Sequence, residues 1–383
     1  MDLFDDIART EHRTPLAEDT KFSYLNLSAR PEAAAVRAFL EDCLSRYPAD
    51  HRDALVTRLR SIDTTHDAAV FELLVHEMLI RAGHEIVEVE PAVQGRSTNP
   101  DFVVRAPDRT EFIVECVMAN GESSSDASAQ RRLRSALDAA SAVPSPVHFI
   151  AVKVGGVPTQ PVSLKALRRD LATWIAQLPD DEAAAKHARP LIHRQHGLQL
   201  MFSAMVKRKK PFVAGDRSIG STSYGIRTAI PGDDLRGSLL KKANKYGPLP
   251  VPYVIAVNGA GDAAGERDLL DALLGSTVAT LRRSTPDDEG TLEGGRSNDG
   301  VLHDGRRARK RGVSAILSFD YVSAWRPWGR GARIVRNPWA NRPLPDIPLP
   351  VDQLNPVDGE FVKVPNDAGA AMFGLDADWP PEP

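Results

Sequence analysis

The 383-residue chain has only two cysteines, Cys43 and Cys116, which stand far apart in sequence. Two such thiols argue against a disulfide framework and against a cysteine-rich zinc site. The chain also lacks any run approaching the roughly 18–20 uninterrupted apolar residues of a membrane-spanning helix. Its first residues, MDLFDDIARTEHRT, are acidic where a signal peptide would be basic and then apolar. We therefore expect a cytoplasmic protein without a membrane partner.

An excess of charge of one sign is also missing, because the formal net charge is −3. Nothing global therefore demands a nucleic-acid partner, and such a partner would have to bind local basic patches. Candidate patches are RRLR (131–134), VKRKK (206–210), LLKKANK (239–245) and GRRARKRG (305–312). Each run is equally typical of a solvated face. The lysines that we expect to contact phosphates are Lys207, Lys209, Lys210, Lys241, Lys242 and Lys245.

Hydrophobic residues make up 42% of the chain, enough for a substantial core. Apolar spacing predicts two short amphipathic helices before residue 60, and then a helix over 67–81 that is apolar on more than one face. Runs rich in Val, Ile and Phe predict strands at 84–90, 101–105 and 111–117. A helix near 126–140 and a strand at 147–154 follow. The sequence therefore predicts an α-β-β-β-α-β order.

Two acidic residues stand in the predicted strands. Strand side chains alternate between faces, so Glu115 shares a face with Ile113 and Val117, where an uncompensated carboxylate would be costly to bury. A divalent cation bound to Glu115 would provide compensation, and Asp101, which opens the preceding strand, could reach the same cation. Carboxylates are typical ligands of Mg²⁺, which activates water and neutralises charge on a phosphodiester.

The element order, the Glu in FELLVHE, the Pro-Asp pair at 100–101 and the acid at 115 resemble the PD-(D/E)xK restriction-endonuclease-like superfamily over residues 66–155. The resemblance implies a restriction-endonuclease-like α/β core with a mixed sheet. It also implies that Asp101 and Glu115 hold Mg²⁺ or Mn²⁺, and that Glu72 is an accessory acid. The family's lysine, two residues after the strand acid, is Val117 in this chain. Lys153 and Gln130 are the substitutes nearest to the expected topology.

We expect residues 1–60 to form an N-terminal helical arm and residues 61–160 the nuclease-like core. Residues 161–345 would form an α/β extension that could continue the sheet, with a mobile loop near 284–312, and residues 346–383 a Pro-rich tail along the surface. The expected function is a metal-dependent DNA endonuclease, in restriction or phage defence by association with the family. The alternative is a catalytically inactive module that binds nucleic acid or protein. A homodimer or a partner subunit is compatible with either.

Two other motifs are incomplete. HEMLI (76–80) begins like the zinc-protease motif HExxH, but Ile80 replaces the second histidine. NGAGDAAG (258–265) has GxGxxxG spacing, which differs from the dinucleotide-binding GxGxxG, and no P-loop lysine follows it.

Overall fold

A computed structural model describes residues 2–16, 19–119, 124–156, 158–181, 184–185, 187–206, 219–221, 231–259, 265–282, 291–357 and 360–380. The chain divides into two compact units. Unit 1 comprises Met1–Glu11, Lys21–Gly121 and Ala229–Pro383, and unit 2 comprises His12–Thr20 and Glu122–Thr228. Apart from its short first segment, unit 2 is therefore an insertion into unit 1. No helix within the described ranges combines the length and the apolar character needed to cross a membrane.

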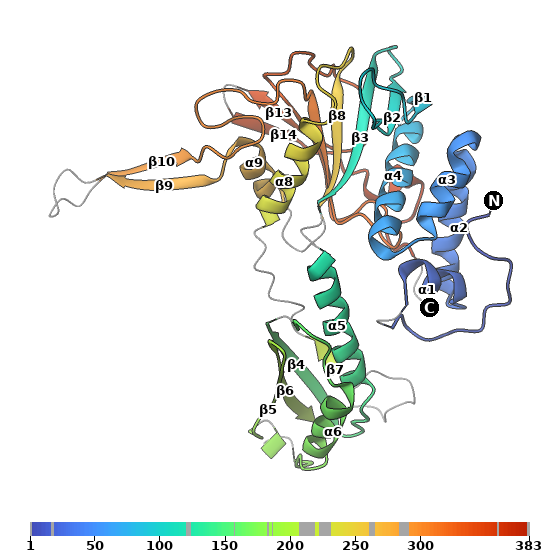
Figure 1. The fold of residues 1–383 in the computed structure, drawn as a ribbon, viewed down its shortest axis with the longest axis vertical. Helices are drawn as coiled ribbons and strands as arrows, with labels where there is room; N and C mark the ends of the chain where they lie inside the picture. Colours follow the sequence, from blue (N-terminus) through green and yellow to red (C-terminus); the bar gives the residue numbers. More distant parts are fainter. Residues whose placement is uncertain are drawn as a thin grey trace. The chain divides into compact units, whose positions relative to one another are not determined.

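Unit 1 contains an eight-stranded mixed sheet in its described part (Figure 1). Across the sheet the strands are β1 (Glu85–Val89), β2 (Phe102–Arg105), β3 (Glu111–Ala119), β8 (Tyr253–Gly259), β11 (Ala315–Asp320), β12 (Ala332–Arg336), β13 (Asp352–Val357) and β14 (Glu360–Val364). The first three form an antiparallel meander, and β8 runs parallel to both β3 and β11. Strands β12 and β13 are also parallel, whereas β11–β12 and β13–β14 are antiparallel. The predicted mixed α/β class is confirmed.

Helices cover both faces of this sheet (Figure 1). One face packs against the helices α1 (Lys21–Leu27), α2 (Pro31–Arg46), α3 (Ala49–Leu59) and α4 (Asp63–Arg81). The other face packs against α8 (Pro231–Ala243) and α9 (Glu266–Leu274). Alternation along β3 separates the two cores, because Phe112 and Val114 face the α4 side and Ile113 faces the α8 side.

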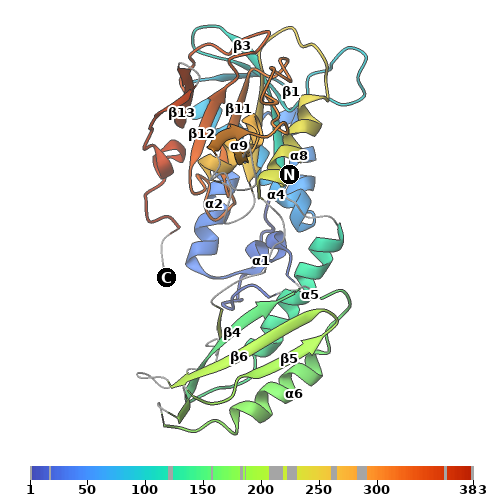
Figure 2. The ribbon, with the colours of Figure 1, turned by 90° about the vertical axis from the view of Figure 1, so that its left-hand side faces the viewer.

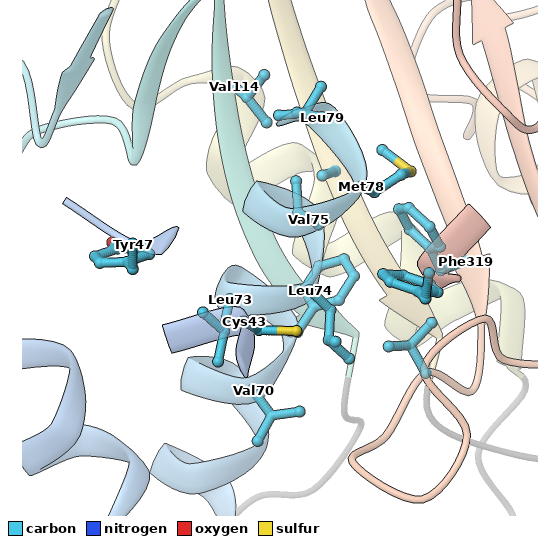
Figure 3. Close-up of a cluster of buried hydrophobic side chains, with 14 of the residues drawn as sticks. Cys43, Tyr47, Val70, Leu73, Leu74, Val75, Met78, Leu79, Val114 and Phe319 are labelled. Carbon is cyan, nitrogen blue, oxygen red and sulfur yellow. The ribbon is translucent and has the colours of Figure 1, made fainter. Parts of the chain in front are cut away.

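Helix α4 is buried along most of its length, as its apolar sequence predicts. Figure 3 shows its side chains between the sheet residues Val114 and Phe319 and the α2 residue Cys43. A helix that is apolar on several faces needs neighbours on several sides, and α2, α3 and the sheet supply them. The acid and imidazole groups of α4 are consequently buried as well.

The insertion corrects the predicted core. Helix α5 (Ser124–Ser141) and strand β4 (His148–Gly155) were expected to complete the core after β3, but they belong to unit 2. Helix α8 and strand β8 take those two places, since β8 is the strand that pairs with β3. Both pairs of segments have the same helix-then-strand pattern, and hydrophobic periodicity does not specify which strand neighbours β3. The boundaries expected at 61–160 and 161–345 are therefore wrong.

Unit 2 contains a four-stranded sheet in its described part, in the order β5 (Leu191–Gln195), β6 (Leu198–Val206), β4 and β7 (Ile219–Ser221). Helices α5 and α6 (Leu164–Ile175) pack on one face of it (Figure 2). Alternate residues of β4 are buried, among them Ile150 and Val152, and they contact α5 and α6 residues such as Leu137 and Leu167. Unit 2 thus has a core of its own.

Three segments are more ordered than expected. In the predicted mobile loop, β10 (Thr291–Arg296) pairs with β9 (Thr277–Arg282), and Val301 and Leu302 are fully buried; residues 283–290 lie outside the described residues. The Pro-rich tail contributes β13, β14 and the 3₁₀ helix η1 (Gly369–Phe373) instead of only covering the surface. The N-terminal arm buries Leu3 and Phe4. In each segment a few buried apolar side chains and main-chain pairing are enough to order the chain, although the composition is polar.

Candidate functional site

Asp101 and Glu115 lie beside each other at the end of the β2–β3 pairing. Phe102 of β2 pairs with Val114 of β3 in an antiparallel register, so the next position places Asp101 opposite Glu115. Directly opposite residues of an antiparallel pair are on one face of a sheet, with Cβ atoms about 4.5–5.5 Å apart. The main-chain N–H of Cys116 donates to Oδ2 of Asp101 at 2.5 Å. The two acids predicted from sequence are thus brought together.

The carboxylate of Glu115 is buried, with only 1% of the residue exposed, and accepts bonds from three side chains. The ammonium groups of Lys242 and Lys245 donate to Oε1, the latter at 2.9 Å, and the hydroxyl of Tyr246 donates to Oε2. The Tyr246 hydroxyl also lies 2.7 Å from the carbonyl of Asn99. Burial of a carboxylate is costly unless it is paired, and here two cations and a hydroxyl provide that compensation.

The ionisation of these donors follows from the same contacts. Burial opposes the charged form of Lys242, but the charge of Glu115 and the hydrogen bond to it outweigh burial, so the pKa of Lys242 is raised. Burial and the bond to Glu115 also raise the pKa of Tyr246. Lys242 is therefore an ammonium and Tyr246 a neutral phenol at neutral pH.

Glu72 lies on α4 and is held by two neighbours. The guanidinium of Arg58, from α3, donates to both carboxylate oxygens at 2.6 and 2.7 Å, and the hydroxyl of Tyr47 donates to Oε1 at 2.9 Å. One turn further along, the ring of His76 lies 4.8 Å from that of Tyr47, and burial lowers the pKa of His76 to about 4. Glu72 is thus a paired, immobilised carboxylate, and His76 is neutral.

The pKa of Asp101 depends on the charges of both Glu115 and Glu72. Burial around its carboxyl group, followed by the charges of Glu115 and Glu72, raises the pKa of Asp101 to about 7. The N–H of Cys116 and the ammonium of Lys242 act in the opposite direction. A carboxyl group with such a pKa exchanges its proton readily near neutral pH, and its carboxylate form would be favoured by an added cation.

Val117 stands where the PD-(D/E)xK motif has its lysine. Val117 is half-buried and packs in the α8-facing core, two residues beyond Glu115 on β3. The amine closest to the motif is instead Lys242, which contacts Glu115 from α8. Lys153, the substitute proposed from sequence, is exposed on β4 of unit 2, and Gln130 belongs to α5 of the same unit.

The lysines expected to contact phosphates divide into three groups. Lys242 and Lys245 are ion-paired with Glu115. Lys241 is exposed on α8. Lys207, Lys209 and Lys210 lie outside the described residues.

Sequence reasoning missed three residues of the cluster, namely Tyr246, Arg58 and Tyr47. The spacing of Lys242, Lys245 and Tyr246 is a signal that was available, because positions i, i+3 and i+4 lie on one face of a helix and its following turn. Arg58 and Tyr47 gave no comparable signal, since they come from the N-terminal helices and reach Glu72 only through tertiary packing.

The donor set bears on which metal could bind. No group of three or more His, Cys, Asp or Glu side chains arranged to hold a metal ion is found among the described residues. The pair of Asp101 and Glu115 remains, and two carboxylates with water suit Mg²⁺ or Mn²⁺ better than zinc. Such an ion would compete with Lys242 and Lys245 for the oxygens of Glu115.

Comparisons with protein-family models, with curated proteins and with solved structures return no match to this chain. The chemistry of the cluster of Asp101, Glu115, Glu72 and Lys242 is therefore the basis for assigning a function.

Proposed function

We propose that the chain is a metal-dependent nuclease of the PD-(D/E)xK type that hydrolyses phosphodiester bonds in DNA. The observation that carries this proposal is the contact between Lys242 and Glu115 beside Asp101. It supplies an amine next to two carboxylates, which is the combination of groups in the family's motif.

The order of elements in unit 1 supports the proposal. Helix α4, the meander of β1, β2 and β3, helix α8 and the parallel strand β8 follow one another once unit 2 is set aside. This is the α-β-β-β-α-β order of the family, and it holds β8 next to β3 rather than the β4 strand expected from sequence. Asp101, immediately before β2, and Glu115, on β3, match the two acids of the family's motif.

The two carboxylates fit a hard cation. Asp101 has a pKa near 7, so at neutral pH it readily becomes the anionic oxygen ligand that Mg²⁺ requires. Oε1 of Glu115 already accepts from two ammonium groups, so a positive charge is accommodated at that oxygen. When bound, Mg²⁺ would polarise the scissile phosphate and favour hydroxide over water.

Lys242 would then assist the reaction from the α8 side. Its ammonium keeps its charge, because the charge of Glu115 raises its pKa despite burial. A positioned ammonium donates hydrogen bonds to the attacking water and stabilises negative charge that develops on the phosphate. Lys245 and Tyr246 would hold Glu115 in place while Lys242 performs this role.

Glu72 is proposed as a positioning residue. Arg58 and Tyr47 fix its carboxylate, and its charge is one of the causes that raise the pKa of Asp101. Glu72 would therefore favour cation binding at Asp101 by increasing the negative potential there, without itself being a ligand.

One observation favours the alternative of an inactive binding module. Glu115 is saturated by Lys242, Lys245 and Tyr246, an arrangement that compensates a buried charge without any metal. In that case the cluster would stabilise the fold, and binding of DNA would persist in EDTA. A Glu115→Gln variant would bind DNA as tightly as the wild-type chain.

Cleavage of supercoiled plasmid with Mg²⁺, Mn²⁺ or EDTA tests the proposal. We expect nicking with either metal and none in EDTA, with Asp101→Asn and Glu115→Gln each reducing the rate at least about 100-fold. A control variant, Glu111→Gln, removes an acid from the exposed start of the same strand and should cleave normally. Metal-dependent nicking that persists in both site variants would rule out this site, and the absence of nicking by the wild-type chain would favour the binding module.

A further inference from the structure

Four connections of unit 1 that gather around the C-terminal end of α8 are rich in positive charge, and of their cations Lys245 is paired with Glu115. They contain eight Lys and Arg residues and no Asp or Glu, in a chain whose net charge is −3. We call this surface the basic rim, and it consists of residues 91–99, 244–252, 305–312 and 338–343.

Hydrogen bonds join three of these connections. The ammonium of Lys310 donates to Oδ1 of Asn244 at 2.6 Å, which ties segment 305–312 to the turn after α8. Nε of Arg342 donates to the carbonyl of Pro250 at 3.0 Å, which ties segment 338–343 to the same turn. Nε of Arg311 in turn donates to the carbonyl of Trp339 at 2.9 Å. The three segments thus form one continuous surface.

The fourth connection approaches from the β1–β2 side. The hydroxyl of Tyr246 donates to Glu115 and also lies 2.7 Å from the carbonyl of Asn99. A guanidinium nitrogen of Arg96 lies 3.0 Å from where a Cβ of Gly247 would be. The basic rim therefore borders the carboxylate cluster directly.

The cations of the rim face solvent. Arg96, Arg306, Arg307, Arg311 and Arg342 are exposed, and the side chain of Arg307 is 86% exposed. An acid stands only at the border, where Asp304 lies 3.6 Å from Nε of Arg307. Such clustering of guanidinium groups from separate loops gives a strongly positive surface that is complementary to a polyanion.

We propose that the basic rim binds the sugar–phosphate backbone of a DNA duplex and leads it to the Asp101–Glu115 site. This inference rests on the proposed function, since it names the surface by which that site receives its substrate. Arginine recognises phosphate oxygens through paired N–H donors, and the rim presents several arginines in segments that contain no acid. Contacts of this kind are to the backbone, so the rim contributes affinity and little base preference.

The test is fluorescence anisotropy with a labelled duplex in EDTA, where cleavage does not interfere. Arg306→Gln combined with Arg307→Gln should weaken binding about tenfold or more, and should reduce the slope of log K against log salt by about 2, since each lost phosphate contact contributes about 1. The matched control combines Arg267→Gln with Arg169→Gln, which removes two exposed charges outside the rim and should leave Kd within about twofold. Unchanged melting temperatures would show that both variants are folded.

The outcomes separate this inference from the nuclease assignment. If the rim variant binds as the control does, the rim proposal is overturned, whether or not the wild-type chain cleaves DNA. If the rim variant loses binding while no metal supports cleavage, the rim proposal stands and only the nuclease assignment fails. Displacement of the duplex by polyglutamate at equal charge concentration would identify a general acidic-protein surface and overturn the assignment to DNA.

Discussion

Lys242 donates a hydrogen bond to Glu115 across a sequence separation of 127 residues, with all of unit 2 except its short first segment inserted between them. In the proposed active site, this contact supplies from a helix the amine that the strand lacks at Val117. It distinguishes the proposed active site from a site that has merely lost its lysine, and it leads to the first prediction.

Replacing Lys242 with alanine should reduce single-turnover cleavage by about 10²–10⁴-fold, because the step loses its charged hydrogen-bond donor. The adjacent Lys241 is exposed and is not among the lysines that contact Glu115, so Lys241→Ala is a matched control that should keep most of the activity. Equal activities of the two variants would remove Lys242 from the mechanism, and rates with saturating metal are the measurement.

Tyr246→Phe should lower the free energy of unfolding by about 1–3 kcal/mol, because Oε2 of the buried Glu115 would lose its hydroxyl donor. Urea denaturation monitored by circular dichroism measures the change. Tyr321→Phe is the control, since Tyr321 is 47% exposed and should change stability little. A stability loss no larger than the control's would mean that water replaces the hydroxyl.

Arg58→Met should destabilise the fold by about 2–4 kcal/mol, since the buried carboxylate of Glu72 would keep only Tyr47 as a partner. The double variant Arg58→Met with Glu72→Gln should recover part of that loss, because no buried charge then remains unpaired. Chemical denaturation of the single and double variants gives the coupling energy, and strictly additive effects would contradict the pairing.

The stability of the metal-free protein should depend on pH through Asp101. Its folded pKa of about 7 lies above the unfolded value near 3.9, so the folded chain binds the extra proton between those limits. Stability relative to Asp101→Asn should therefore decrease as pH rises from about 4 to 7, by at most about 1.4 kcal/mol per pH unit, and should level off above pH 7. Urea midpoints in EDTA at several pH values test this, and parallel curves for the two proteins would contradict it.

Added Mn²⁺ should raise the melting temperature at pH 8, where Asp101 is ionised and available as a ligand. The shift should be absent in Asp101→Asn and in Glu115→Gln, and present in Glu111→Gln, which removes an exposed acid from the same strand. Differential scanning fluorimetry over a range of metal concentrations measures it. Equal shifts in all four proteins would indicate binding elsewhere.

Much of the local structure could be predicted from sequence. The meander of β1, β2 and β3 matches its prediction within two residues. Hydrophobic alternation and strand-forming residues are local signals, so they suffice for these elements. The burial of Glu115 was likewise predictable from its Val and Ile neighbours.

The long-range arrangement could not be predicted in the same way. The choice of β8 over β4 as the partner of β3 depends on which of two similar helix-strand pairs packs on the sheet, and that choice is made by the complete cores. For the same reason the contact between Lys242 and Glu115 could not be predicted, since it follows from the packing of α8 against β3. Lys153 was proposed because it stands in the strand that was expected at that position.

The insertion of unit 2 also sets the order in which the site can form during synthesis. Glu115 leaves the ribosome long before Lys242, and the loop between them is far longer than those that close within a meander, so its closure costs more entropy. Strand β3 remains without its neighbour β8 while unit 2 is synthesised and forms its own core. Until α8 and β8 follow, the nascent chain holds the acids but not the amine, and any chemistry that needs both is withheld until the polypeptide is more than half complete.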